Sequence, residues 1–212
     1  MSRFTILLGG DLVRTPELGV QITGTRVIAA DSGIRHARLL GVTPELWLGD
    51  FDSVSEETLA AHSDVKREVF PLEKDFTDGE LAITAALREG ATALVLAGAF
   101  GGARADHAYL HLAQALRLEE EGIPVLLTSG AQEGRPLLVG EHEFDYADGT
   151  LFSILGFSDL SGLTVEGAKW PLDNVEVAFG SSLTISNEVR GRLRISLAKG
   201  RAILVVHRIL EV

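Results

Sequence analysis

Closely spaced aspartates dominate the chemistry that this sequence can offer. Leu48-Gly49-Asp50-Phe51-Asp52-Ser53 puts two carboxyl groups directly after the apolar run Leu46-Trp47-Leu48. If that run is a buried strand, Asp50 and Asp52 lie at one edge of a sheet, where their repulsion opposes folding unless a cation intervenes. Mg²⁺ suits such a site, because it prefers oxygen ligands and takes one or two carboxylates while substrate phosphates and water complete its shell.

A second acidic segment follows, Lys74-Asp75-Phe76-Thr77-Asp78. Ser53-Val54-Ser55-Glu56 and Thr77-Asp78-Gly79-Glu80 both match the capping-box pattern, so part of each cluster can simply begin a helix. Capping does not require Asp50, Asp52 and Asp75 as well. Acids at strand ends that face helix N-termini can hold a metal ion and phosphate together, and the whole cluster therefore favours metal–nucleotide binding.

A glycine-rich segment offers different chemistry: Gly98-Ala99-Phe100-Gly101-Gly102-Ala103-Arg104-Ala105-Asp106-His107. Its glycines let the main chain approach a ligand, and Arg104 offers a planar fork of donors for phosphate. Asp106 can accept a hydrogen bond from a ribose or base, or it can cap a helix after a flexible turn. His107 and His111 have a spacing that can bind zinc, but no further ligand supports it, so a partly exposed helical face is the preferred interpretation.

The second half of the chain contains one prominent aromatic turn, Glu166-Gly167-Ala168-Lys169-Trp170-Pro171-Leu172. Trp170 can stack on a flat ligand, especially a cationic one. The alternative is a tryptophan that seals the edge of a β-sandwich. Ser186-Asn187-Glu188 can likewise be a plain turn.

The elements that must position these residues follow two patterns. Up to residue 127, short apolar runs alternate with amphipathic runs of helix length, which is the βαβ rhythm of a parallel sheet. Strands are expected at residues 4–8, 26–30, 45–48, 65–70, 93–97 and 124–128, and helices at 33–40, 56–62, 78–88 and 106–120. Ligands collect at the carboxyl ends of such strands, where four polar or glycine-rich turns converge. These turns are Gly9-Gly10-Asp11, Asp31-Ser32-Gly33, Gly49-Asp50-Phe51-Asp52 and residues 98–102.

After Ser129-Gly130 the helical periodicity ends. Short apolar runs recur between Gly, Asp and Ser turns at residues 150–155, 163–165, 175–179, 193–197 and 202–206. This pattern predicts a small antiparallel β-sandwich. The fold class predicted for the whole chain is α/β, with a Rossmann-like, parallel-sheet domain over residues 1–134 and a β-sandwich domain over residues 135–212.

The composition excludes several functions. Acids outnumber Lys and Arg by 30 to 19, a net charge of −11, so the summed field repels a nucleic-acid backbone and no nucleic acid is expected as a partner. The absence of cysteine excludes disulfides and thiolate sites and fits a reducing cytoplasm, the expected location. No segment reaches the length of a membrane span, so no membrane partner is expected. The three-glycine dinucleotide fingerprint and a Walker A lysine motif are both missing.

These motifs, in this order, resemble those of the thiamine pyrophosphokinase (thiamine diphosphokinase) family over nearly the whole chain. The segments that carry the resemblance are Ala30-Asp31-Ser32-Gly33, Gly49-Asp50-Phe51-Asp52-Ser53, Lys74-Asp75-Phe76-Thr77-Asp78, Arg104-Ala105-Asp106-His107, Gly167-Ala168-Lys169-Trp170-Pro171-Leu172 and Ser186-Asn187-Glu188. The chain departs from the family pattern at two points. Ala103 is inserted before Arg104, and His111 stands where the family commonly has Asn.

The resemblance implies an enzyme that transfers the pyrophosphoryl group of ATP to the hydroxyl of thiamine, giving thiamine diphosphate and AMP. It implies that Asp50, Asp52 and Asp78 are catalytic and hold Mg²⁺, and that one aspartate also accepts the hydroxyl proton. ATP would be bound by Asp31, Lys74, Asp75, Thr77, Arg104 and Asp106, and thiamine by Trp170, Ser186 and Asn187. The resemblance further implies a homodimer whose thiamine sites are shared between subunits.

Two other functions stay open at this point. A metal-dependent glycosyltransferase would use Asp50-Phe51-Asp52 to hold Mn²⁺ or Mg²⁺ on a nucleotide sugar, and it gives the Trp170 turn no role. A non-catalytic nucleotide-sensing module would bind ATP without turnover. Thermal shifts with ATP, nucleotide sugars and thiamine, each with and without Mg²⁺, separate the three functions.

Overall fold

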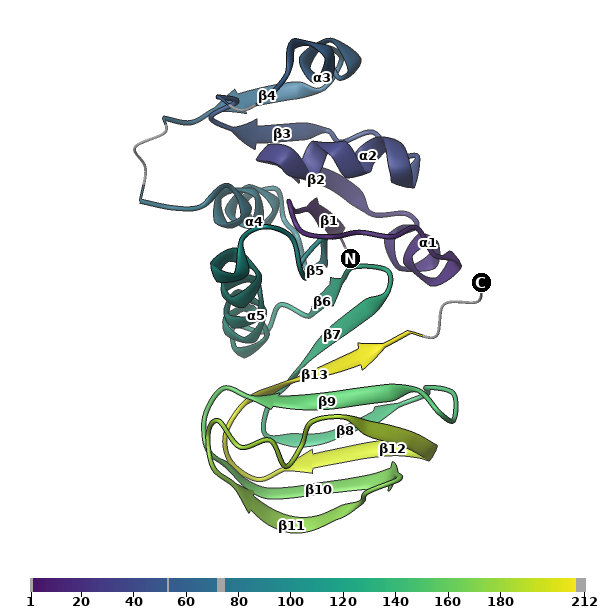
Figure 1. Ribbon diagram of the computed structural model, residues 1–212. Helices are drawn as coiled ribbons and strands as arrows, with labels where there is room; N and C mark the ends of the chain where they lie inside the picture. Colours follow the sequence, from purple (N-terminus) through teal and green to yellow (C-terminus); the bar gives the residue numbers. More distant parts are fainter. Residues whose placement is uncertain (1, 53, 72–74, 209–212) are drawn as a thin grey trace. The chain divides into compact units, whose positions relative to one another are not determined.

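A computed structural model describes residues 2–52, 54–71 and 75–208 (Figure 1). The contacts between residues divide the chain into two compact units. The first is built from residues up to His111 together with Ile123–Gly130, and the second from Leu112–Gly122 together with the residues from Ala131 onward. Gly134, near which the domain boundary was predicted, lies inside a strand, and the predicted division at that point stays a prediction.

A parallel sheet forms the centre of the first unit, as the βαβ rhythm predicts. Its strands are β1 (Arg3–Leu7), β2 (Arg26–Ala30), β3 (Leu46–Gly49), β4 (Lys66–Val69), β5 (Ala93–Ala97) and β6 (Val125–Thr128). They lie in the order β6-β5-β1-β2-β3-β4. The chain builds the sheet outward from β1 in one direction and then in the other, so the order reverses between β1 and β5. In open α/β sheets, ligands bind beside such a reversal, at the carboxyl ends of the strands.

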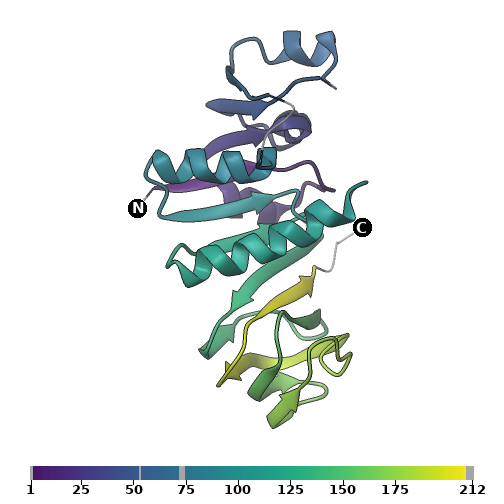
Figure 2. The same ribbon diagram turned by 90° about the vertical axis from the view of Figure 1, so that its left-hand side faces the viewer.

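Helices cover both faces of this sheet. They are α1 (Pro16–Ile22), the 3₁₀ helix η1 (Asp31–Ile34), α2 (Arg35–Leu40), α3 (Glu56–Ala61), α4 (Asp78–Arg88) and the start of α5 (Ala105–Glu120), whose residues up to His111 belong to this unit. Figures 1 and 2 together show α4 and the start of α5 on one face and α1 and α2 on the other. No helix in the described part of the chain is long and apolar enough to cross a membrane.

Helix α1 was not expected from the sequence, although its start signal is present there. The Thr15 hydroxyl accepts a hydrogen bond from the Leu18 N–H at 3.1 Å, and Pro16 occupies the first turn. Leu18 and Ile22 are buried and pack against side chains of the sheet. With only seven residues, the helix is too short to produce a clear amphipathic period.

The second unit is an antiparallel β-sandwich, as the repeated short runs predict. Its strands are β7 (Gln132–Leu137), β8 (Gly140–Phe144), β9 (Leu151–Gly156), β10 (Leu160–Ala168), β11 (Leu172–Val177), β12 (Asn187–Leu197) and β13 (Ala202–His207). One sheet has the order β7-β13-β9, and the other contains β11, β10, β12 and β8. β12 connects them, because its first two residues pair with β9 and the rest pairs with β8 and β10. Strands β7 and β8 were not expected.

Candidate active site

A cleft of about 390 Å³ lies in the first unit, beside the reversal of strand order. Its walls come from the Gly9-Gly10-Asp11 turn after β1, from residues 30–32 after β2, and from residues 101–104 after β5. Arg35 at the start of α2 and the starts of α4 and α5 complete it. We call the first of these segments the β1 turn and residues 98–102 the β5 turn. The sequence therefore placed three of the convergent turns correctly.

Glycines allow the β1 turn and the β5 turn to lie against each other. The Gly10 N–H donates to the Gly98 carbonyl at 3.0 Å, and the Asp11 N–H donates to the Phe100 carbonyl at 2.8 Å. A Cβ atom on Gly10 would collide with both of these carbonyl oxygens. Only glycine therefore fits at position 10, and the two turns form one continuous floor of main chain under the cleft.

Four aspartates at this edge of the sheet are close enough for the charges of three of them to change the pKa of the fourth. Asp31 begins η1, Asp50 and Asp52 follow β3, and Asp78 begins α4. Burial raises the pKa of the Asp31 carboxyl, and the charges of Asp78, Asp50 and Asp52 raise it further, although the Ser32 N–H acts in the opposite direction. The sequence expectation that these acids converge is thus supported by the field that each exerts on Asp31.

Asp31 is also held in an unusual conformation. Its φ is 43°, a left-handed backbone that costs free energy for a residue with a side chain. The Trp47 indole N–H donates to the Asp31 carbonyl at 2.9 Å, and Gly49 packs so closely that a Cβ there would lie 3.4 Å from Asp31 Oδ1. That oxygen is buried and has no hydrogen-bond partner among the described residues.

These carboxylates have the donor chemistry that Mg²⁺ requires. Within residues 2–52, 54–71 and 75–208, no three acidic or histidine side chains lie close enough to enclose a metal ion by themselves. A Mg²⁺ site needs only one or two carboxylates when phosphate oxygens and water supply the other ligands. The buried, unpartnered oxygen of Asp31, whose ionised form is disfavoured by its surroundings, is the kind of group that a bound cation stabilises. The ligand set Asp50, Asp52 and Asp78 stays a prediction.

The residues predicted to bind ATP have different environments. Arg104 and Asp106 form a two-pronged ion pair, with Nε to Oδ1 at 3.0 Å and Nη2 to Oδ2 at 2.6 Å. This hydrogen-bonded pair holds the pKa of Asp106 well below its usual range. Asp75 is exposed, and Lys74 lies outside the described residues.

The sequence predicted helix N-caps at Thr77 and Ser53. The structure has the first at Thr77, but the second is Ser55, two residues after the predicted position. Thr77 Oγ1 accepts from the Glu80 N–H at 3.3 Å and so begins α4. For α3 the N-cap is Ser55, which accepts from the Thr58 N–H at 3.2 Å. Ser53 lies outside the described residues. Thr77 therefore has a structural role whether or not it also contacts ATP.

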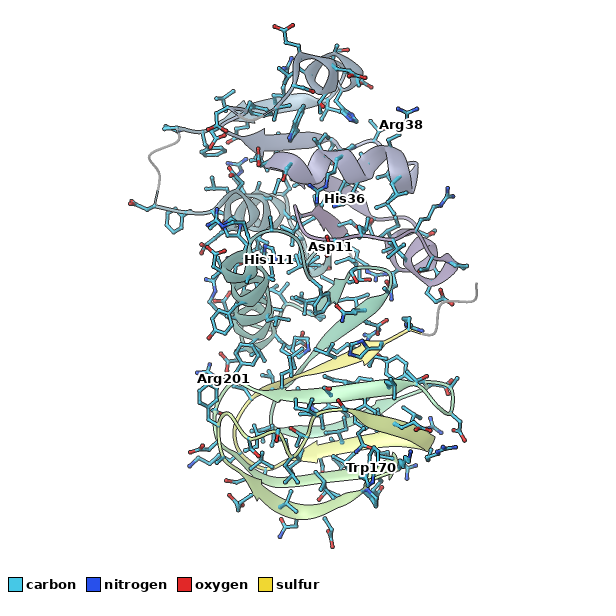
Figure 3. The ribbon with its side chains drawn as sticks, in the orientation of Figure 1. Asp11, His36, Arg38, His111, Trp170 and Arg201 are labelled. Atoms are coloured by element: carbon cyan, nitrogen blue, oxygen red, sulfur yellow. The ribbon has the colours of Figure 1, made fainter. Side chains whose placement is uncertain are left out.

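Two residues that line the cleft, Arg35 and His111, and the neighbouring His36 were missed or misjudged from the sequence. Arg35 Nη2 donates to the Gly9 and Gly10 carbonyls at 2.6 and 3.0 Å. His36, which is labelled in Figure 3, has its Nε2 3.0 Å from the Gly10 carbonyl. His111 was expected on a partly exposed helical face but is buried, with Nδ1 3.2 Å from the Ala99 carbonyl. Burial lowers the pKa of both histidines. The four-residue spacing from His107 to His111 does not indicate that His111 contacts a carbonyl of the β5 turn.

In the second unit, Trp170 is exposed to 55%, so it is not part of the core of the sandwich (Figure 3). The Lys169 ammonium lies 4.7 Å from the centre of its ring. Asn187 is buried and holds the turn: its Nδ2 donates to the Trp170 carbonyl at 2.8 Å, and its Oδ1 accepts from the Trp170 N–H at 3.2 Å. Ser186 is exposed, with a φ of 63°. Its role and that of Asn187 in binding a ligand stay predictions.

The chain is similar to known proteins along its whole length. Residues 23–127 match the family model described as thiamin pyrophosphokinase, catalytic domain, and residues 141–201 match the thiamin pyrophosphokinase, vitamin B1 binding domain. Thiamine pyrophosphokinase of Bacillus subtilis (strain 168) is 30% identical over 211 residues, which are 97% of this chain and 98% of that relative.

Solved structures give the same result. The crystal structure of thiamine pyrophosphokinase from Bacillus subtilis superposes with a TM-score of 0.84 at 27% identity, covering 99% of this chain and 100% of that one. The crystal structure of the Geobacillus thermodenitrificans thiamin pyrophosphokinase gives a TM-score of 0.79 at 26% identity, covering 99% and 98%. Both units of the chain therefore have counterparts in these relatives.

Proposed function

The chain belongs to the thiamine pyrophosphokinase family, and from this premise we propose that it transfers the pyrophosphoryl group of ATP to the hydroxyl of thiamine. The products are thiamine diphosphate and AMP. The observation that carries the proposal is that Asp50, Asp52 and Asp78 all act electrostatically on Asp31, a residue that lines the cleft, in a chain whose other unit matches a vitamin B1 binding model. The relatives described above give no support to a glycosyltransferase or to a nucleotide-sensing module.

Transfer of a pyrophosphoryl group depends on in-line placement and on neutralisation of phosphate charge rather than on a covalent nucleophile. Asp50, Asp52 and Asp78 would hold Mg²⁺, with Asp31 close by. When bound, Mg²⁺ supplies positive charge to the phosphate oxygens. One of the aspartates accepts the proton of the thiamine hydroxyl.

The remaining predicted residues bind and orient the nucleotide. Arg104 and Lys74 supply positive charge, while Asp75, Thr77 and Asp106 line the ATP site. The ion pair with Asp106 fixes the Arg104 guanidinium in one plane, which suits recognition of a phosphate or ribose group at the edge of the cleft. The glycine floor lets the phosphates approach the main chain.

Thiamine recognition is assigned to the second unit, through Trp170, Ser186 and Asn187. Thiamine carries a cationic thiazolium ring, and the face of an indole attracts cations. The Lys169 ammonium, 4.7 Å from the ring centre, makes a contact of this kind within the protein, and the 55% exposure of Trp170 supports a role for the ring in binding a cationic ligand. Asn187 keeps the Trp170 turn in place through two main-chain hydrogen bonds.

We further propose that the protein is a homodimer and acts in the cytoplasm, as the resemblance and the cysteine-free composition predict. Several large apolar side chains of the second unit are exposed, and a subunit interface is a common reason for such exposure. They are Leu151, Phe179, Leu183 and Ile185. In the proposed dimer, thiamine-binding residues of one subunit serve the ATP site of the other.

Product identity tests the proposed reaction. The protein is incubated with ATP, MgCl₂ and thiamine, and the products are separated by chromatography and identified by mass spectrometry. AMP and thiamine diphosphate in equal amounts are expected, and both should disappear when thiamine is omitted or Mg²⁺ is chelated. ADP with thiamine monophosphate would mean transfer of a single phosphoryl group, and ATP binding without products would favour the sensing module.

A further inference from the structure

The described residues that line the cleft carry more negative than positive charge. Three of them are aspartates, Asp11, Asp31 and Asp78, and two are arginines, Arg35 and Arg104. The Arg104 charge is already paired with Asp106 at 2.6 Å. A polyphosphate that enters this cleft therefore needs a further cation from the protein, in addition to any metal ion that it brings.

Arg35 has the contacts expected of that cation. Its Nη2 donates both of its hydrogens to main-chain carbonyls, those of Gly9 at 2.6 Å and Gly10 at 3.0 Å. Among the described residues it forms no ion pair, and its Nε and Nη1 donors have no hydrogen-bond partner. Carbonyl groups fix the guanidinium in position without cancelling its charge. One edge of the group is thus anchored to the β1 turn, while the other donors remain available at the wall of the cleft.

The neighbour of Arg35 strengthens the anchor. His36 Nε2 lies 3.0 Å from the Gly10 carbonyl, and burial lowers the pKa of this imidazole, so the ring adds little positive charge of its own. The β1 turn is fixed on its other side by the Gly98 and Phe100 carbonyls. Arg35 therefore projects from a rigid support, which limits the entropy lost when it binds a ligand.

We propose that Arg35 binds the phosphate chain of ATP through its Nε and Nη1 donors while its Nη2 keeps the β1 turn in place. The inference rests on the proposed function, because it takes ATP as the substrate. It adds a phosphate contact from the start of α2, next to the β1 turn, to the residues predicted from the motifs. A planar guanidinium with several donors suits a phosphate group better than a single ammonium does.

Three variants test the inference: R35A, R35K and the control R38A. Arg38 is on the same helix and is exposed, but it is not among the residues that line the cleft (Figure 3). Calorimetry with the full-length protein measures the Kd of ATP in the presence of MgCl₂, and inhibition assays measure the Ki of inorganic tripolyphosphate and of adenosine. Loss of a charged hydrogen-bonding group predicts about 10- to 100-fold weaker binding of ATP and tripolyphosphate in R35A. Binding of adenosine should change less than about twofold, R35K should be intermediate, and R38A should match the unmodified protein.

Two results would overturn the inference. One is unchanged ATP binding in R35A. The other is an equal loss for adenosine and for tripolyphosphate, because collapse of the β1 turn would harm the whole site, whereas loss of a phosphate contact would not. If R35A unfolds, R35K and R35Q provide the same comparison, since both keep a donor for the carbonyls of the turn. Failure of the proposed function has a separate signature, because products other than AMP and thiamine diphosphate would appear with the unmodified protein.

Discussion

Asn187 should stabilise the free protein, in addition to any contact that it makes with thiamine. It is only 8% exposed, and its side-chain amide joins the start of β12 to the main chain of the Trp170 turn between β10 and β11. Oδ1 accepts from the Trp170 N–H at 3.2 Å and from the Glu188 N–H at 2.8 Å, and Nδ2 donates to the Trp170 carbonyl at 2.8 Å. Replacement of Asn187 by Ala removes all three hydrogen bonds at once.

The size of the effect follows from these contacts. A hydrogen bond contributes about 0.5 to 1.5 kcal/mol net, and an unmet buried group costs more. Trp170 is half exposed, so water can reach its N–H and carbonyl after the substitution and limit the loss. We therefore expect Asn187→Ala to lower the free energy of unfolding by about 2 to 3 kcal/mol. For a chain of this length, that corresponds to a fall in Tm of about 4 to 12 °C.

Thermal melts and urea titrations of the ligand-free protein measure this loss. Ser186→Ala is the matched control, because Ser186 is the exposed neighbour and its main-chain N–H, which the substitution keeps, donates to Ser153 Oγ at 3.0 Å. The control should stay within about 0.5 kcal/mol of the unmodified protein. Loosening of the turn should also raise the thiamine KM of Asn187→Ala while leaving the ATP KM close to its original value.

The result that would refute this reasoning is a normal Tm in Asn187→Ala together with a raised thiamine KM. Asn187 would then act only as a ligand contact, and its hydrogen bonds to the Trp170 turn would have no energetic importance. A lowered Tm in Ser186→Ala as well would show that the whole turn is sensitive to substitution. In that case the loss could not be assigned to the amide of Asn187.

Four further predictions concern the acids and the aromatic turn. Asp52→Asn should lower kcat by a factor of about 100 or more, measured as AMP formation at ordinary Mg²⁺, because charge neutralisation dominates such transfers; full activity would remove Asp52 from the metal site. Asp31→Asn should raise the Tm of the protein in EDTA at neutral pH, because a folded-state pKa above the unfolded value of about 3.9 means that ionised Asp31 opposes folding. This gain should vanish as the pH falls from the folded pKa toward the unfolded one, and a gain that is equal at every pH would contradict an electrostatic cause. Trp170→Ala should raise the thiamine KM up to about 30-fold and spare the ATP KM, since cation–π attraction contributes about 0.5 to 2 kcal/mol. Mixed with Asp52→Asn subunits under exchange, it should recover activity if sites are shared, and no recovery would exclude the shared site.

The parallel sheet could be predicted from sequence because both faces of its strands are covered, which leaves continuous apolar runs. Strand β7 shows where this reasoning ends. Its Glu133 is 1% exposed, and its charge is met by Arg135 Nε at 2.7 Å and Arg208 Nη2 at 2.6 Å, with the Tyr146 hydroxyl donating at 2.7 Å. Although burial acts in the opposite direction, these partners lower the pKa of Glu133. Tyr146 and Arg208 are distant from Glu133 in the sequence. Because a sequence pattern does not reveal such partners, a glutamate at this position is typical of a loop rather than of a buried strand.

The candidate site was predictable to a similar extent. Acids that follow strands of one sheet must meet at one edge, and the field of Asp50, Asp52 and Asp78 at Asp31 agrees with that rule. Arg35 was not predictable, because its contacts are main-chain carbonyls and any residue type supplies a carbonyl. Sequence patterns reveal chemistry that resides in side chains, whereas a cation held by the backbone of a glycine turn becomes visible only in the folded chain.

The two sides of the cleft differ in the charges that they present to a ligand. On the side of β2 and β3, Asp31 has a left-handed backbone, a buried oxygen without a described partner and three acids that disfavour its charge. On the side of the β1 turn, the Arg35 guanidinium is held by carbonyls that leave its charge uncancelled. The first side opposes folding through repulsion and strain, and the second presents a cation that has no carboxylate partner among the described residues. A polyphosphate with Mg²⁺ presents a cation to the acids and anionic oxygens to the arginine, so one ligand satisfies both sides. Unfavourable features that are matched in this way by a single ligand are typical of a binding site that has been kept at the expense of stability.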